Sequence, residues 1–383
     1  MLVVLTLVGT RPEAIKMAPV LKELGKHRDQ IRSIVCVTGQ HRQMLEQALE
    51  IFQIHPDYDL AVMEPDQMLS RLTTKLLTSL NPVVEETHPN WILAQGDTTT
   101  VLVAALVSYY QRVLFGHVEA GLRTGDKFRP YPEEMNRRIA DQLADALFAP
   151  TEQNRQALLR EGIADNKIAV TGNTVVDALQ FTAERPFDWS TGPLASLPEQ
   201  KQIVLVTAHR RESFGQPLRE ICLAVKELSI SLNSEGVHFV YPVHLNPNVR
   251  KAAEGILSGL PNVSLIEPLD YSSMIHLMKR SKLILTDSGG IQEEAPSLGV
   301  PVLVMRDATE RPEGVEMRVA RLVGTNRSRI VEEVTRLLRD PAAYAAMVTR
   351  ENPYGDGNAS RRIVSFLLQY SEGAVKTDQA REE

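Results

Sequence analysis

Several acidic residues stand where a predicted strand ends or a predicted helix begins. Asp97 and Glu119 each follow closely on a short apolar run, and Glu133 and Glu134 lie in the segment RPYPEEMN at the start of a helical pattern. Acids gathered in a cleft change one another's pKa through burial and repulsion, which suits general acid/base catalysis. Asp97, Glu119 and Glu133 therefore predict proton transfer at a bound substrate. The alternative is that each only stabilises the first turn of a helix.

A second group of residues is suited to phosphate. The segment DSGGIQEEA runs from a predicted strand straight into a helix, with Ser288, Gly289 and Gly290 at the junction. The glycines let a ligand approach the backbone, and the N–H groups of the helix start and the serine hydroxyl can hold phosphate oxygens. Glu294, one turn further on, can accept hydrogen bonds from ribose hydroxyls. A simple helix cap in a tight turn is the alternative.

Basic residues follow other predicted strands. Arg11 and Lys16 lie in GTRPEAIK, His209 and Arg210 in TAHRRE, and Arg311 in TERPE. Arginine binds phosphate through parallel hydrogen bonds, and a histidine can donate a hydrogen bond or carry a proton. These residues predict a site for an anionic group such as a diphosphate. A basic cluster on the surface is the alternative for the pair in TAHRRE.

The elements that must position these residues alternate between short apolar runs and longer helical patterns. Strands are predicted at 2–8, 31–38, 91–94, 113–118, 203–207, 238–243, 282–286 and 301–305. Continuous apolar strands separated by helices are typical of parallel sheets covered on both faces. Ligands bind outside the carboxyl ends of such strands, so we expect the acids, the basic residues and the glycines to face a cleft between two domains.

The pattern of strands and helices starts again in the second half of the chain. The segment 188–202 contains two prolines and few large apolar residues, so it is predicted to be a linker between domains at 1–187 and 203–370. The last helix of the second domain is able to pack back on the first. A polar tail follows at 371–383.

Composition and charge exclude several classes of protein. The chain has 383 residues, and 42 Lys and Arg against 48 Asp and Glu give a net charge of −6, which argues against a nucleic-acid or membrane-surface binder. Cys36 and Cys222 lie in apolar runs and predict buried, reduced thiols. No run approaches the roughly 20 apolar residues of a membrane span. We therefore expect a cytoplasmic protein.

Motifs for several common chemistries are missing from the sequence. There is no HExxH or comparable metal spacing and no GxSxG nucleophile motif. The first glycine loop is not GxGxxG, and no acidic residue ends the following strand as a nicotinamide cofactor requires. We expect no metal and no cofactor.

The motifs together resemble those of the non-hydrolysing UDP-N-acetylglucosamine 2-epimerases. The resemblance covers roughly residues 1–370 and runs through GTRPEAIK, GDTTT, GHVEAGLRT, TAHRRE, YPVHLNP, DSGGIQEEAPSLG and NPYGDG. It implies an α/β fold of two Rossmann-like domains with parallel sheets, in the GT-B-type architecture of many glycosyltransferases, with the ligand in the interdomain cleft. It also implies a cytoplasmic homodimer that works without a cofactor.

The resemblance implies an isomerase that interconverts UDP-GlcNAc and UDP-ManNAc for cell-surface polysaccharide synthesis. A base removes the C2 proton, UDP leaves C1 to give 2-acetamidoglucal, and UDP adds back while C2 is reprotonated on the other face. The catalytic positions carried over are Asp97, Glu119, Glu133 and His209. The positions carried over for UDP are Arg11, Lys16, Ser288, Gly289, Gly290, Glu294 and Arg311.

Two further features follow from the resemblance. Leu269 and Met274 stand near the expected uracil pocket, where some members carry Gln and Phe. Some bacterial members bind a second UDP-GlcNAc as an activator, and the positions that resemble this allosteric site are Gln43, Glu134, Arg210 and His244. Asp66 stands where regulated members are expected to carry a basic residue.

Three other functions share parts of these motifs. A hydrolysing epimerase would release UDP and free ManNAc, and its chemistry begins in the same way. A GT-B glycosyltransferase would keep the phosphate loop but has little need for three acids around the donor sugar. A non-catalytic UDP-sugar sensor would need none of them.

Overall fold

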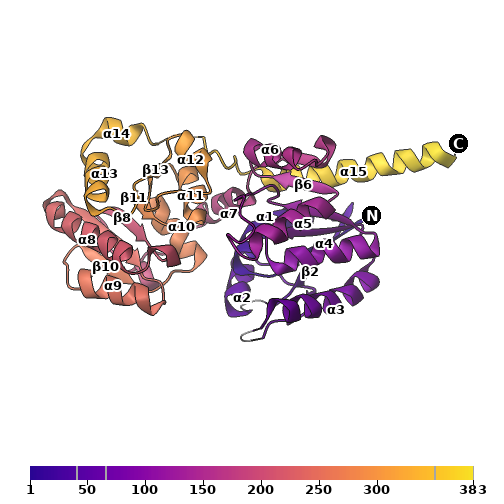
Figure 1. Cartoon of the computed structure of the whole chain (residues 1–383), viewed down its shortest axis with the longest axis horizontal. Helices are drawn as coiled ribbons and strands as arrows, with labels where there is room; N and C mark the ends of the chain where they lie inside the picture. Colours follow the sequence, from indigo (N-terminus) through magenta and orange to yellow (C-terminus); the bar gives the residue numbers. More distant parts are fainter. Residues whose placement is uncertain (40–41, 65–66, 349–350, 383) are drawn as a thin grey trace. The chain divides into compact units, whose positions relative to one another are not determined.

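The computed structural model in Figure 1 describes residues 1–39, 42–64, 67–348 and 351–382. The chain forms two compact units: unit 1 is Met1–Ala178 with Tyr354–Glu383, and unit 2 is Leu179–Pro353. The chain therefore leaves unit 1 once and returns to it for its last helix. Each unit is built around its own sheet.

Unit 1 contains a seven-stranded parallel sheet in the order β3-β2-β1-β4-β5-β6-β7. Its strands are β1 (Leu2–Val8), β2 (Ile31–Val37), β3 (Tyr58–Asp59), β4 (Trp91–Gln95), β5 (Leu114–Val118), β6 (Ala146–Ala149) and β7 (Ile168–Val170). The strand order reverses between β1 and β4, and ligands of doubly wound sheets bind beyond the carboxyl ends of such a strand pair.

The helices of unit 1 connect these strands. They are α1 (Arg11–Leu24), α2 (Arg42–Ile51), α3 (Leu69–Thr87), α4 (Thr99–Gln111), α5 (Glu133–Leu143), α6 (Glu152–Arg160), α7 (Thr174–Ala183), whose last turns belong to unit 2, and α15 (Ala359–Glu382). Helix α1 begins with a capping box, in which the Thr10 hydroxyl accepts from the Glu13 N–H while the Glu13 carboxylate reaches back to the Thr10 N–H. This cap fixes where the helix starts, immediately after β1.

Unit 2 contains a six-stranded parallel sheet in the order β10-β9-β8-β11-β12-β13. Its strands are β8 (Gln202–Thr207), β9 (Val237–Pro242), β10 (Val263–Ile266), β11 (Ser281–Thr286), β12 (Val302–Val304) and β13 (Ala320–Leu322). Its helices are α8 (Gln216–Ser231), α9 (Pro247–Leu257), α10 (Tyr271–Arg280), α11 (Gly289–Glu294), α12 (Pro312–Glu316), α13 (Arg327–Arg339) and α14 (Pro341–Ala345). Here the order reverses between β8 and β11.

The predicted α/β class with two parallel sheets is confirmed. All eight predicted strands are present with ends shifted by no more than one residue, which is within the usual uncertainty of element boundaries. The sequence reading missed β3, β6, β7, β10 and β13. Most of these are short strands at or near a sheet edge, where the apolar run is too brief to stand out.

The division between the units falls at Ala178, ahead of the predicted linker at 188–202. Leu194 and Leu197 in that segment are buried in the apolar cluster of unit 2. The segment 188–202 has few apolar residues, but these two leucines attach it to the core of unit 2.

Helix α15, yellow in Figure 1, belongs to unit 1 and contacts α1. The ring of Tyr370 meets that of Trp91 edge-on at 5.1 Å, and Phe366 meets Phe148 at 5.4 Å. The helix start is capped by the Asp177 carboxylate, which accepts from the Ser360 N–H at 2.8 Å and from its hydroxyl at 2.6 Å. The polar tail continues the helix to Glu382.

Both cysteines are free and buried, as predicted, and burial raises the pKa of each thiol to about 12. Among the described residues, no helix is long and apolar enough to cross a membrane. The same residues contain no group of three or more His, Cys, Asp or Glu arranged to hold a metal ion.

Candidate functional site

In unit 1, the candidate residues follow the carboxyl ends of three neighbouring strands. Arg11 and Lys16 lie on α1 after β1, Asp97 follows β4, and Glu119 follows β5. Strands β1, β4 and β5 are consecutive in the sheet, so their ends share one edge. Glu133 is the first residue of α5 and is half-buried.

Glu119 is held by buried donors rather than left free. Both carboxylate oxygens accept from the Lys16 ammonium, at 2.6 and 2.7 Å, and the side chains are 5% and 16% exposed for Glu119 and Lys16. Gln95 donates to one oxygen, and Asn173 donates to the other at 2.8 Å. The backbone of Glu119 has a φ of 66°, a conformation that non-glycine residues adopt rarely and that recurs at functional sites.

Asp97 is more accessible, with a side chain 30% exposed. Its carboxylate pairs with the buried Arg137 guanidinium at 2.7 Å, and its backbone carbonyl accepts from the Asn136 amide at 2.9 Å. Gly96 before it has a φ of 91°, which a glycine adopts without strain. Helix α5 therefore fixes both the backbone and the carboxylate of Asp97.

Glu134 serves a different purpose from its neighbour Glu133. Its fully buried carboxylate accepts from the backbone N–H groups of Thr124 at 3.1 Å and Gly125 at 3.4 Å, and lies 3.7 Å from Arg137. It thus ties the loop after β5 to the start of α5. Glu134 was predicted to contact an allosteric ligand. In the structure its carboxylate holds the loop after β5 in place.

Glu13 was not singled out in the sequence, although it lies in the GTRPEAIK motif. It is buried, and its carboxylate accepts from the Gly9 N–H at 2.6 Å. Burial raises its pKa to about 7, against hydrogen bonds that lower it. Arg11 is exposed at the first position of the same helix.

In unit 2, His209 follows β8 and is oriented by a buried carboxylate that the sequence reading also missed. One oxygen of Asp287 accepts from the N–H groups of His209 at 2.7 Å and Arg210 at 2.8 Å. The other oxygen lies 3.5 Å from His209 Nδ1 and makes no hydrogen bond within the described part of the chain. Burial lowers the pKa of His209, Asp287 opposes this, and the neighbouring His244 and Arg210 lower it further.

His244 stacks on His209 with ring centres 5.3 Å apart and planes 9° from parallel. Its Nδ1 accepts from the Asn246 N–H at 3.1 Å, so Nε2 is left for other contacts. The structure thus brings together His209, Arg210 and His244, which the sequence assigned to two different sites.

The Ser-Gly-Gly junction connects β11 to α11, and one arginine lies over it. A Cβ atom on Gly289 would lie 3.0 Å from the Arg311 guanidinium carbon, so a larger residue there would displace the guanidinium by a few tenths of an ångström. Arg311 is held by Glu293 at 2.8 Å and by Glu310 at 2.8 Å. Ser288 at the start of α11 is half-buried, and Gly290 is exposed.

Glu310 joins three arginines of unit 2. It lies 2.8 Å from Arg311, 2.7 Å from Arg306 and 3.6 Å from Arg210. Burial raises the pKa of Glu310, but Arg311 and Arg306 outweigh it and lower the pKa below its usual value. A ring of arginines around one carboxylate is a set of donors that suits a phosphate group.

Glu294 is buried beside Tyr271, whose pKa is raised by burial and by the charge and hydrogen bond of Glu294. Leu269 and Met274, near the expected uracil pocket, belong to the apolar cluster of unit 2. The side chain of Gln43 lies outside the described residues, so its predicted part in an allosteric site stays a prediction. Asp66, which stands where a basic residue is expected in regulated members, also lies outside them.

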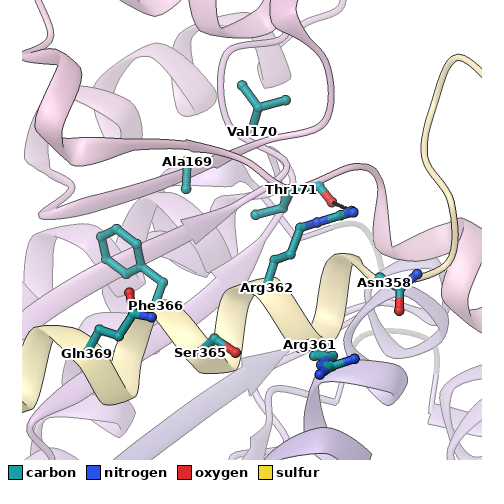
Figure 2. A pocket seen from close by; sticks show the side chains of 9 residues that line it. All are labelled: Ala169, Val170, Thr171, Asn358, Arg361, Arg362, Ser365, Phe366 and Gln369. Carbon is teal, nitrogen blue, oxygen red and sulfur yellow. Dashed lines mark hydrogen bonds between the residues drawn. The ribbon is translucent and has the colours of Figure 1, made fainter.

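An open pocket of about 580 Å³ lies elsewhere, on unit 1, between β7 and the start of α15 (Figure 2). Arg362, which lines it, donates to the Thr171 carbonyl and pairs with Asp356. None of its lining residues is one of the predicted site residues.

Comparison with known proteins places the chain in a family. The model of the family described as UDP-N-acetylglucosamine 2-epimerase matches residues 22–368. The chain belongs to the UDP-N-acetylglucosamine 2-epimerase family. The UDP-N-acetylglucosamine 2-epimerase of Yersinia pestis is 53% identical over 373 residues, which make up 96% of this chain and 98% of that one.

Solved structures of the family share the whole fold. The UDP-GlcNAc 2-epimerase of Neisseria meningitidis bound to UDP-GlcNAc is 47% identical, covers 96% of this chain and 100% of its own, and has a TM-score of 0.85. A family structure from Listeria monocytogenes is 43% identical, covers 97% of both chains and has a TM-score of 0.90. The family and the fold expected from the sequence motifs are thereby confirmed, while the roles of single residues remain predictions.

Proposed function

We propose that this protein interconverts UDP-GlcNAc and UDP-ManNAc by epimerisation at C2 and supplies the product for cell-surface polysaccharide synthesis. The observation that carries this proposal is the identity of about half of all positions, over nearly the full chain, to proteins named for that activity. The geometry supports it, because Asp97 and Glu119 follow the ends of adjacent strands with buried partners that orient them.

The proposed reaction is an elimination followed by an addition. A carboxylate takes the C2 proton, the electron pair of that C–H bond forms the C1=C2 double bond, and the C1–O bond breaks so that UDP leaves with its electron pair. UDP then attacks C1 of the 2-acetamidoglucal while a second acid delivers a proton to the opposite face of C2. Inversion therefore needs at least two acid/base groups, and Asp97, Glu119 and Glu133 provide three.

We assign the sugar to the acids of unit 1 and the UDP group to the basic residues and the glycine junction of unit 2. Arg311, His209 and the Ser288–Gly290 junction offer donors for the diphosphate, and Glu294 offers an acceptor for the ribose. Arg11 and Lys16 complete the set from unit 1. Lys16 is paired with Glu119 in this structure, so binding of a diphosphate to Lys16 would also change the surroundings of that acid.

We further propose that the active form is a cytoplasmic homodimer and that UDP-GlcNAc activates it through Gln43, Glu134, Arg210 and His244. Sedimentation velocity of the purified chain tests the dimer. A time course with UDP-ManNAc alone tests the activation. The proposal expects a lag that added UDP-GlcNAc abolishes, and linear turnover without stimulation contradicts it.

The central experiment is incubation with UDP-GlcNAc in D₂O, followed by ¹H NMR of the sugar. Epimerisation predicts UDP-ManNAc with deuterium at C2 and little free UDP. Free ManNAc with an equal amount of UDP would instead identify a hydrolysing enzyme. A folded protein that binds UDP-GlcNAc without exchange at C2 would favour a GT-B glycosyltransferase, which needs an acceptor, or a sensor.

A further inference from the structure

A fully buried histidine lies beneath the loop that carries Asp97. His117 is on β5 and has no exposed surface. Its Nδ1 lies 2.6 Å from an oxygen of Asp141, and its Nε2 lies 2.7 Å from the backbone carbonyl oxygen of Gly96. We propose that His117 is held permanently as an imidazolium and is a positioning residue for Asp97, bound to the loop through the Gly96 carbonyl.

The charge of His117 follows from its two partners. A carboxylate and a backbone carbonyl can only accept hydrogen bonds, and a neutral imidazole has only one N–H. With one N–H, a ring lone pair would face an oxygen at 2.6 or 2.7 Å, and this repulsion is costly at a fully buried side chain. Two N–H groups satisfy both oxygens.

The surroundings of His117 compensate its charge. Asp141 is fully buried and also pairs with Arg123 at 2.7 Å, and Arg123 pairs with Glu161 at 2.7 Å. The charges therefore alternate from His117 through Asp141 and Arg123 to Glu161, which also pairs with Arg138 at 3.4 Å. Burial lowers the pKa of His117, but the charge of Asp141 and the hydrogen bonds outweigh both burial and the repulsion from Arg123, so the pKa is raised overall.

The same network reaches the two loops that carry proposed catalytic acids. His117 fixes the carbonyl of Gly96, immediately before Asp97. The second oxygen of Asp141 accepts at 3.3 Å from the N–H of Gly121, two residues after Glu119. Asn136 and Arg137 hold Asp97 itself, and the Gly96 N–H donates to the Val118 carbonyl at 3.0 Å. The side chain that holds the Gly96 carbonyl is that of His117.

The first test is spectroscopic and requires no turnover. Two-dimensional ¹H–¹⁵N spectra of the imidazole groups, assigned with His117→Gln, are expected to show both His117 nitrogens protonated from pH 6 to 9. In Asp141→Asn, which keeps the shape but removes the charge, one of these protons should be lost within that range. A single protonated nitrogen in the wild-type protein at pH 7.5 would overturn the proposal.

The second test is kinetic and rests on the proposed epimerisation. His117→Gln should lower kcat for C2 exchange by about 100-fold, the effect of displacing a reacting group by about 1 Å. KM and the affinity for UDP should change less than twofold. The matched control is His238→Gln, a buried histidine of unit 2 bonded to Ser264, which should keep full activity.

The two tests separate the possible failures. If the wild-type protein shows no exchange at C2, the proposed function fails while the spectra still decide the state of His117. Unchanged kcat in a folded His117→Gln protein refutes the positioning role. If His117→Gln does not fold, Asp141→Asn takes its place, and a kcat equal to that of the wild type then refutes the role.

Discussion

Replacing Lys16 by methionine removes the cation that neutralises Glu119 while keeping an apolar stem of similar length. The pair makes two contacts at 2.6 and 2.7 Å, and its side chains are only 16% and 5% exposed. Leaving a buried carboxylate without its partner costs about 3 kcal/mol of stability. Gln95 and Asn173 still donate to it, so we expect no greater loss.

A double-mutant cycle isolates the pair. Lys16→Met with Glu119→Gln removes both charges, so the combined loss should be only about 1 kcal/mol. The coupling is this combined loss minus the two single losses, so with about 3 kcal/mol for Lys16→Met its magnitude should be at least about 2 kcal/mol. The control Lys26→Met breaks an ion pair whose lysine is 70% exposed, and its effect should stay below about 0.5 kcal/mol.

Urea unfolding measures these free energies. The protein has two tryptophans, the buried Trp91 in unit 1 and Trp189 in unit 2, so a Trp189→Phe background makes fluorescence report on unit 1 alone. If Lys16→Met loses no more stability than Lys26→Met, or if the two substitutions of the cycle are additive, the burial argument for this pair is wrong.

Three other predictions follow from single contacts. The raised pKa of Glu13 means that its contribution to stability is complete below pH 4.5 and is lost as the pH rises through about 7, so Glu13→Gln should flatten the decline of the urea midpoint between pH 5 and 8. Gly289→Ala places a methyl group 3.0 Å from the Arg311 guanidinium and should weaken UDP binding about tenfold in calorimetry, with little change in stability. Asp287 opposes the lowering of the pKa of His209, so Asp287→Asn should lower that pKa further in an NMR titration; an upward shift would contradict the assignment.

The sequence predicted the strands that lie at the centre of each sheet. Such strands are buried on both faces, so nearly every side chain in them must be apolar. The sequences of β1, β4, β8 and β11 are therefore nearly continuous apolar runs, which stand out from the polar residues around them. Edge strands are shorter and half-exposed: β7 has Val170 at 43% exposure, and its pattern does not stand out from a loop. The burial of Leu194 and Leu197 in the predicted linker segment was not visible in the sequence, because it depends on packing against residues far away in the chain.

The candidate acids and the phosphate loop were also visible in the sequence, because strand ends and glycine-rich helix starts have local signals. The residues that hydrogen-bond to these acids could not be predicted from the sequence. Asn173 donates to Glu119 across 54 positions, and Arg137 pairs with Asp97 across 40. Neither partner has a residue type or spacing that marks it from the sequence alone.

The sequence by itself determined the α/β class, the family, and the position of the reactive residues after the carboxyl ends of the strands. These features depend on apolar periodicity and short motifs, which involve residues close together in the chain. The tertiary structure alone decided which charges are paired. It joined Lys16 to Glu119, Asp287 to His209 and Asp141 to His117. Protonation depends on burial and on oxygens and nitrogens within about 3 to 4 Å, and the fold brings those atoms together from distant parts of the chain.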